Sequence, residues 1–244
     1  MYKILCKKAG VILIIMSILG LMGCGNDKYT VKRIEKALTE KYGGTFEVLA
    51  LGNRYGTMTN DYVRADVKAV DSGVVFSAKM NTKGEIIADN YAGVLVSKQL
   101  EDMLNSNLEN EGITAKSCMT GFSSIDTGEI EVGISFNDYI AKHKPESFGG
   151  YLVVKESPNN TGAAFINAFQ KTFDTIKNIE LVANVWIIPE ENYDEIIAEM
   201  SQLPDIDNSW FDDKNTLNYF KFVMSTDGVN MAENEINQLF QGGD

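Results

Sequence analysis

Side chains that commonly carry out catalysis are scarce in this sequence. Its 244 residues include one histidine, three cysteines and four prolines. A single histidine excludes any metal site built mainly from imidazole. Basic residues are also the minority, with 22 Lys and Arg against 34 Asp and Glu and a net charge of −12. General nucleic-acid binders need clustered Lys and Arg to displace counterions from phosphates, so the charge argues against that class of partner.

The composition is otherwise that of a folded protein, and the N-terminus carries a targeting signal. Lys3, Lys7 and Lys8 precede a run of 14 uncharged residues, Ala9 to Met22. A membrane-spanning helix needs about 20 apolar residues, so this shorter run is typical of the apolar region of a signal peptide. An ordinary cleaved signal peptide and an uncleaved anchor are the competing interpretations.

The apolar run ends in Leu21-Met22-Gly23-Cys24. This tetrapeptide resembles the lipobox of bacterial lipoproteins, with Met22 as a mild departure from the usual pattern. The resemblance implies a diacylglycerol on the Cys24 sulfur and cleavage after Gly23. Residues 1–23 would then be a lipoprotein signal peptide and 24–29 a lipidated tether. Because two acyl chains hold a protein stably, we expect an extracytoplasmic protein attached to the cell membrane.

Removal of the signal peptide makes the chain more acidic. The remaining sequence has 19 basic and 34 acidic residues, a net charge of −15, with the acids concentrated in 190–213. Anionic headgroups repel such a chain within about a Debye length of 8 Å. We therefore expect the lipid, and not the protein surface, to contact the membrane, and any charged partner to be cationic.

The hydrophobic pattern predicts an α+β protein. A helix from Thr30 to Tyr42 precedes alternating strands in 62–70 and 74–80, which is typical of a helix followed by an antiparallel meander. We place this first unit at 30–112 and a second, mixed α/β unit at 113–244. The boundary near Gly112 leaves one domain or two open.

The second unit has both kinds of pattern. Ile130, Val132, Ile134 and Phe136 alternate with polar residues and predict a strand over 129–136. The order strand, helix, strand over 151–155, 165–176 and 179–188 favours a crossover onto one sheet. A helix over 193–203, a strand over 217–225 and a closing helix over 229–240 complete the pattern.

A second resemblance lies in the first unit. The run from Lys36 to Val48, a helix ending in Lys-Tyr-Gly and then a strand, is similar to openings of uncharacterised lipoproteins of Gram-positive bacteria. The resemblance implies a location at the cell surface and transfers no catalytic residue.

The acidic stretch contains a candidate calcium loop. Asp205 and Asp207 begin the spacing of a calcium-binding loop, but Trp210 stands where a glycine is needed and Thr216 where a glutamate is needed. An irregular site using Asp205, Asp207 and either Asp212 or Asp213 is one interpretation. A solvated acidic loop is the default.

Trp210 and Phe211 are the large aromatic residues of this loop. Exposed loop aromatics are favoured binding anchors, so these two are candidate contacts for a ligand or partner. The competing and favoured interpretation is that they pack onto the body of the protein.

Three further patterns have simple structural explanations. Asp126-Thr127-Gly128 matches the aspartic-protease triplet, but it occurs once, and those enzymes need two such loops. Cys118 would need His143 as its base, and His143 lies in a segment that we expect to be a solvent-facing connector. The loop 157–162 could present N–H groups to an anion, but a helix cap is its ordinary interpretation.

These observations assign no catalytic residue. We predict a binding or accessory module of the cell envelope. The alternatives are a carboxylate-dependent envelope hydrolase, using acids of 190–213 or the Asp126 loop, and a small-ligand-binding lipoprotein.

Overall fold

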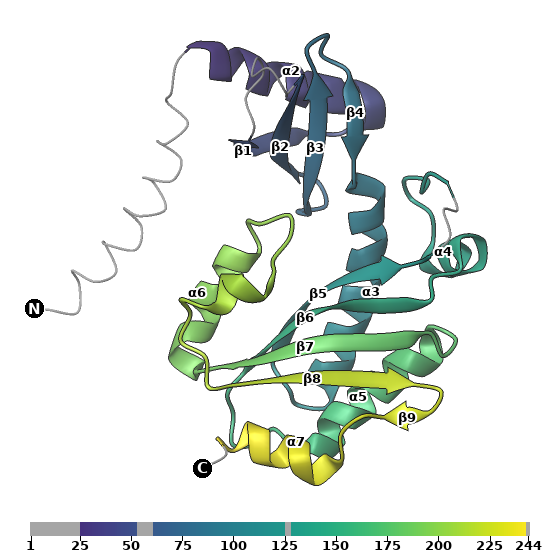
Figure 1. Cartoon of the computed structure of the whole chain (residues 1–244), viewed down its shortest axis with the longest axis vertical. Coiled ribbons are helices and arrows are strands. Elements are labelled where there is room, and N and C mark those ends of the chain that lie inside the picture. The colour runs from purple at the N-terminus through teal and green to yellow at the C-terminus, as the bar shows by residue number, and fades with distance from the viewer. Residues whose placement is uncertain (1–24, 53–60, 125–127, 243–244) are drawn as a thin grey trace, which may run out of the picture. The chain divides into compact units, whose positions relative to one another are not determined.

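The computed structural model describes residues 25–52, 61–124 and 128–242, and its chain divides into two compact units. Unit 1 is Met1–Asp89 and unit 2 is Asn90–Asp244. In the described residues, unit 1 combines one helix with a sheet and unit 2 combines several helices with a second sheet, so the predicted α+β class is confirmed (Figure 1). Within the residues so described, no helix is both long enough and apolar enough to span a bilayer.

Unit 1 is a helix followed by an antiparallel meander, as the sequence pattern predicts. Its elements are α2 (Gly25–Tyr42), β1 (Phe46–Gly52), β2 (Tyr62–Ala69), β3 (Val75–Asn81) and β4 (Ile86–Asp89). The strands lie in the order β1-β2-β3-β4, and each pairs with its neighbour antiparallel.

The alternation along β2 separates the two faces of the unit 1 sheet. Val63, Ala65 and Val67 are buried, whereas the residues between them are exposed or half-buried. Ile34 and Leu38, one helical turn apart on α2, are fully buried and complete this core. The helix is therefore held to unit 1 by one apolar stripe.

Unit 2 is built on a mixed sheet in the order β5-β6-β7-β8-β9. Its elements are α3 (Tyr91–Asn110), β5 (Ala115–Phe122), α4 (Phe136–His143), β6 (Ser147–Lys155), α5 (Gly162–Thr175), β7 (Glu180–Ile188), α6 (Glu190–Met200), the 3-10 helix η1 (Asn208–Phe211), β8 (Asn218–Ser225), β9 (Gly228–Val229) and α7 (Glu233–Phe240). β6 and β7 pair in parallel and the other neighbours pair antiparallel. The predicted crossover through α5 is confirmed.

The two faces of this sheet carry cores of different size. On one face α3, α5 and α7 pack on the strands and form the larger core, centred on Phe165, Phe169 and Phe222. On the other face α6 and η1 cover a smaller core with Val153 and Ile188 from the strands. Successive strand residues point to opposite faces, so Val153 serves the smaller core while Leu152 and Val154 serve the larger one.

In each unit a helix closes the free edge of an outer strand. The Glu101 carboxylate of α3 accepts the N–H of Met119 at 2.9 Å, and Asn105 Oδ1 accepts that of Ser117 at 2.9 Å, both on β5. In unit 1, Glu35 Oε1 of α2 accepts the N–H of Val48 on β1 at 3.2 Å. These side-chain oxygens accept backbone N–H groups that would otherwise be open to pairing with another strand.

Two predicted boundaries are corrected by the fold. The boundary between units falls between Asp89 and Asn90, not near Gly112, because α3 packs on β5 and belongs to the second sheet. Helix α2 begins at Gly25, so residues 25–29 of the predicted tether are helical. The predicted signal peptide 1–23 and Cys24 lie outside the described residues.

The predicted strand over 129–136 is wrong. Residues 128–135 are irregular with a turn at Val132, and α4 begins at Phe136. Ser135 Oγ accepts the N–H of Asp138 at 3.2 Å and caps this helix. Phe136, Tyr139 and Ile140 form its buried face, so a short helical repeat overrides the alternation that precedes it.

β6 is longer than predicted because its glycine pair lies inside the strand. A Cβ at Gly150 would collide with the carbonyl oxygen of Cys118 on β5, and a Cβ at Gly149 would lie 3.0 Å from the Phe122 ring. The two glycines therefore allow close approach within the sheet and do not end it.

Candidate functional site

The carboxyl ends of β6 and β7 lie side by side, and the chain leaves them toward opposite faces of the sheet. After β6 it enters α5 in the larger core, and after β7 it enters α6 over the smaller core. In α/β sheets such a switch point is where ligands commonly bind. The backbone N–H of Glu156 donates to the Ile188 carbonyl at 2.8 Å and ties the two strand ends together.

An open cleft of about 590 Å³ lies at this end of the sheet. Three chain segments line it, namely the segment after β6, the first turn of α6 and the end of α7. The lining residues are Glu156, Ser157, Pro158, Glu190, Glu191, Phe240 and Gln241. We call this the β6–β7 cleft, and its volume is within the range of small-molecule sites.

The β6–β7 cleft is acidic. Glu190 Oε1 lies 2.8 Å from Lys155 Nζ, and this pairing lowers the pKa of Glu190 and raises that of Lys155. Glu156 and Glu191 are exposed, and no ion pair to either is found in the part of the chain that the structure describes. Three carboxylates against one ammonium leave an excess of negative charge.

This geometry fits a binding site for a cation better than a carboxylate hydrolase. A catalytic acid needs a raised pKa, usually through burial, so that it is protonated near neutral pH. Glu190 is exposed and its pKa is lowered, so it stays ionised. Negative charge beside the buried Phe240 ring suits an organic cation.

The loop 157–162 is a helix cap and not an anion site. Thr161 Oγ1 accepts the N–H of Ala164 at 3.2 Å at the start of α5. The N–H of Gly162 donates to Asn237 Oδ1 of α7 at 2.7 Å. The N–H groups of Gly162 and Ala164 at this helix start are therefore engaged within the protein.

The acids of the predicted calcium loop have separate roles. Asp207 Oδ1 accepts from Ser209 Oγ at 2.6 Å and from the Trp210 N–H at 3.1 Å, and so caps η1. Asp213 lies 3.4 Å from Lys214 Nζ, Asp212 ends η1, and Asp205 is exposed. Across residues 25–52, 61–124 and 128–242, no three acidic, His or Cys side chains converge in a way that could hold a metal ion.

The aromatic pair of this loop packs inward. Phe211 is 2% exposed and stacks on Trp186 with ring centroids 4.4 Å apart. Trp210 is half-buried and lies edge-on to Phe211, with ring centroids 4.8 Å apart. Lys214 Nζ lies 5.0 Å from the centre of the Trp210 ring. Phe211 is therefore not an exposed contact, and the interpretation of a packed loop is confirmed for it.

Cys118 and His143 do not form a catalytic pair. Burial raises the pKa of the Cys118 thiol to about 12, and Cys118 packs against the smaller core. His143 lies on the other side of the sheet in α4, stacked on Tyr139 at 5.1 Å and only 3% exposed. The predicted solvent-facing connector at His143 is wrong, because His143 is on the buried face of α4. Asp126 and Thr127 of the protease-like triplet lie outside the described residues.

The sequence did not predict the β6–β7 cleft, although it singled out two of the segments that line it, the acidic stretch 190–213 and the loop 157–162. Glu190 and Glu191 are first-turn acids of a helix, as expected from their place after Pro189. Glu156 and Phe240 had no local signal. The parallel pairing implied by the crossover could have brought Glu156 beside Glu190, whereas the docking of α7 depends on tertiary packing.

The fold and the cleft together define a two-unit α+β protein with an open acidic cleft in its second unit. No family model matches the sequence, and a comparison with curated proteins found no match. Among solved structures, the chain is similar to the crystal structure of a DUF5037 family protein from Ruminococcus gnavus. The TM-score is 0.64 at 16% identity, over 87% of this chain and 99% of that one. At this identity the similarity shows the fold alone.

Proposed function

We propose that this chain is a lipid-anchored extracytoplasmic binding module of the cell envelope, and that the β6–β7 cleft binds a cationic group of its ligand or partner. The lipobox-like Leu21-Met22-Gly23-Cys24 supports the anchor. The placement of Glu156, Glu190 and Glu191 around one open cleft is the observation that carries the binding role.

The chemistry of the cleft favours an amine. Glu156 and Glu191 offer carboxylates to a cation, while Glu190 is already neutralised by Lys155. An ammonium group is a compact point charge that can pair with these carboxylates. A carbon chain attached to it can contact Phe240. Lysine side chains of an envelope protein and polyamines both present this chemistry.

The anchor is tested by replacing Cys24 and following the protein in cell fractions. Cys24→Ser should move the protein out of the membrane fraction or leave its signal peptide uncleaved, and remove the lipid from its mass. Cys6→Ser, which lies in the same segment, is the matched control and should change neither. Equal membrane attachment and equal mass in both variants would contradict the lipid on Cys24.

The cleft is tested with tetralysine as the probe. We expect Glu156→Gln/Glu191→Gln to weaken tetralysine binding by roughly tenfold, as two charge-pair interactions of about 0.7 kcal/mol each would. Glu109→Gln/Glu129→Gln removes the same charge from exposed positions of unit 2 that do not line the cleft. Equal weakening by both pairs would show that only the overall charge matters and would contradict the cleft.

A further inference from the structure

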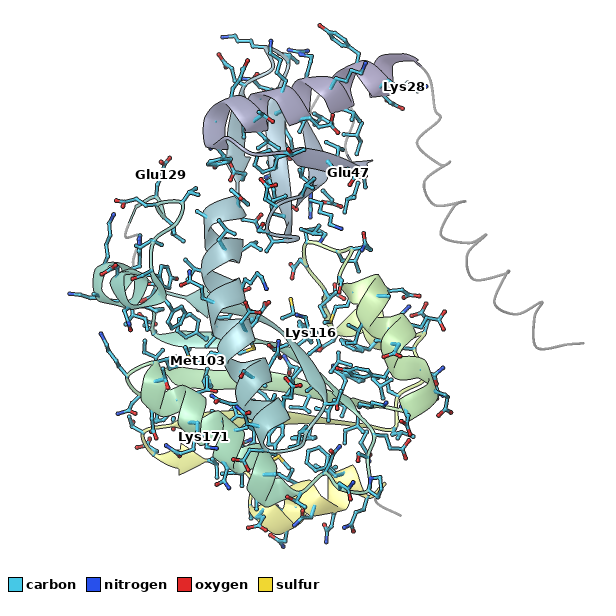
Figure 2. The ribbon with its side chains drawn as sticks, turned by 180° about the vertical axis from the view of Figure 1, so that it is seen from behind. Lys28, Glu47, Met103, Lys116, Glu129 and Lys171 are labelled. Carbon is cyan, nitrogen blue, oxygen red and sulfur yellow. The ribbon has the colours of Figure 1, made fainter. Side chains whose placement is uncertain are left out.

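One face of α2 is basic and exposed. Lys28, Lys32 and Lys36 recur every four residues and are all exposed, so they lie along one side of the helix. The buried stripe of Ile34 and Leu38 lies on the other side. The three lysines span about 12 Å of helix. Figure 2 labels Lys28 in the first turns of α2.

Glu35 and Glu40, two of the three acids of α2, do little to neutralise this face. Glu35 is half-buried, and its carboxylate is engaged by the Val48 N–H. Glu40 lies 3.6 Å from Lys36 in an exposed pair near the far end of the helix. Such pairs are weak in water, so Lys28 and Lys32 remain available to an external anion.

An exposed tyrosine and a second basic segment extend the face. Tyr29 is 64% exposed, and the Arg33 guanidinium lies 5.6 Å from the centre of its ring. Arg33 Nη2 also donates to the Thr82 carbonyl at 3.4 Å in the β3–β4 turn, where Lys83 is exposed. Tyrosine and lysine side chains of this kind are enriched at the level of lipid headgroups.

The charge of the chain is divided unequally between its units. From Gly25 to Asp89 there are 10 Lys and Arg against 9 Asp and Glu, a net charge of +1. From Asn90 to Asp244 there are 9 against 25, a net charge of −16. The repulsion from anionic headgroups that the charge of the whole chain predicts therefore arises from unit 2. Unit 1, with a net charge near zero, contributes none of it.

We infer that this face of α2, Lys28, Tyr29, Lys32 and Lys36 with Lys83 beside it, docks on the anionic phospholipid headgroups of the membrane that holds Cys24. The inference rests on the proposed lipid anchor, because α2 begins at the residue after Cys24 and the anchor brings it to the surface. A protein surface then contacts the membrane together with the lipid. Each basic side chain near an anionic surface contributes about 1 kcal/mol, equivalent to about fivefold in binding.

The test uses the lipidated protein reconstituted into vesicles. One set holds equal parts of phosphatidylglycerol and phosphatidylcholine, and the other holds phosphatidylcholine alone. Brief acetylation with a reagent that does not cross membranes, followed by mass spectrometry, gives the reactivity of each lysine. We expect Lys28, Lys32 and Lys36 to react about fivefold more slowly on the anionic vesicles. The exposed Lys177 and Lys221 of unit 2 are internal controls and should react equally on both.

Charge-reversed variants locate the effect on α2. In Lys32→Glu/Lys36→Glu, Lys28 should lose its protection on anionic vesicles. The matched variant Lys177→Glu/Lys221→Glu should leave the protection of Lys28 unchanged. Circular dichroism of both variants checks that the helix content is retained.

The outcomes separate this inference from the proposed anchor. If the vesicles fail to retain the protein and its mass shows no lipid, the anchor and the docking are both wrong. If the protein is lipidated and retained but its α2 lysines react equally on both vesicle types, the docking alone is wrong. A third sample adds soluble polyphosphate to the phosphatidylcholine vesicles. If polyphosphate protects the α2 lysines there and phosphatidylglycerol vesicles do not, the face binds an anionic polymer and the lipid is not its partner.

Discussion

Units 1 and 2 use similar elements and differ in charge and in core. Counted from Gly25, unit 1 has a net charge of +1 and carries all three arginines, whereas unit 2 has a net charge of −16 and both tryptophans. One apolar stripe of α2 covers the unit 1 sheet, but helices cover both faces of the unit 2 sheet. An average over the whole chain therefore describes neither unit, and each should respond separately to substitution.

The largest effect is expected in the larger core of unit 2. Phe165 is fully buried with ring centroids 4.8 Å from Phe169 and 5.0 Å from Phe222. Phe165→Ala should lower the free energy of unfolding of unit 2 by about 3–5 kcal/mol through lost contacts and a cavity. Denaturant unfolding followed by tryptophan fluorescence reports on unit 2, because Trp186 and Trp210 both lie there. An equal loss of amide-exchange protection in unit 1 would break the comparison, since the units would then unfold together.

A smaller effect is expected at the end of the unit 1 sheet. The Tyr42 hydroxyl donates to the Asp89 carboxylate at 2.8 Å, and Lys41 Nζ lies 2.8 Å from the same group, whose side chain is 3% exposed. Tyr42→Phe removes one donor from this buried carboxylate and should destabilise unit 1 by about 1–3 kcal/mol. Amide exchange of β2 and β3 measures the loss. A fall in the tryptophan-detected midpoint of the same size would show that the change is transmitted to unit 2.

The smallest effect concerns pH and unit 2. Burial raises the pKa of Glu101, although the Met119 N–H bond lowers it in part. A carboxyl group with a raised folded-state pKa stabilises the fold at low pH, and that stability is lost as pH rises above its ordinary value of 4.5 and through the folded pKa. Glu101→Gln keeps an acceptor for Met119 and removes the ionisation. Its stability relative to the unsubstituted protein should therefore increase from pH 4 to pH 8.

The matched control for this pH profile is Glu109→Gln, an exposed position on the same helix. It removes the same charge from α3, so the difference between the Glu101→Gln and Glu109→Gln profiles is assigned to the buried position of Glu101. Parallel profiles for Glu101→Gln and the unsubstituted protein would show that Glu101 does not titrate differently in the folded state.

The sequence predicted the elements well where one local pattern acted alone. In β2 the alternation of Val63, Ala65 and Val67 with polar residues gave both the strand and its buried face. It failed over 129–136, where the cap at Ser135 and the buried face of α4 prevailed. It also failed at Gly149 and Gly150, since only the position of β5 shows why side chains are excluded there.

The candidate site was less predictable than the fold. The acids of 190–213 were visible as a cluster in the sequence, but Asp207 serves as a cap, whereas Glu190 and Glu191 reach the cleft. The other wall comes from Glu156 and Phe240, which are far apart along the chain. A cleft assembled by three distant segments depends on tertiary contacts that no local pattern encodes.

The side chains that close the sheet edges have a consequence for crowding. Glu35 covers the Val48 N–H, and Glu101 and Asn105 cover those of Met119 and Ser117, while the opposite edge strands β4 and β9 have four and two residues. Proteins confined to a membrane plane meet one another far more often than the same number in bulk solution. Strand-by-strand growth between neighbouring copies starts from free N–H groups at a sheet edge, and these side chains occupy such groups on β1 and β5. On the proposed membrane, these covered N–H groups therefore disfavour the pairing of β1 or β5 with a strand of a neighbouring copy.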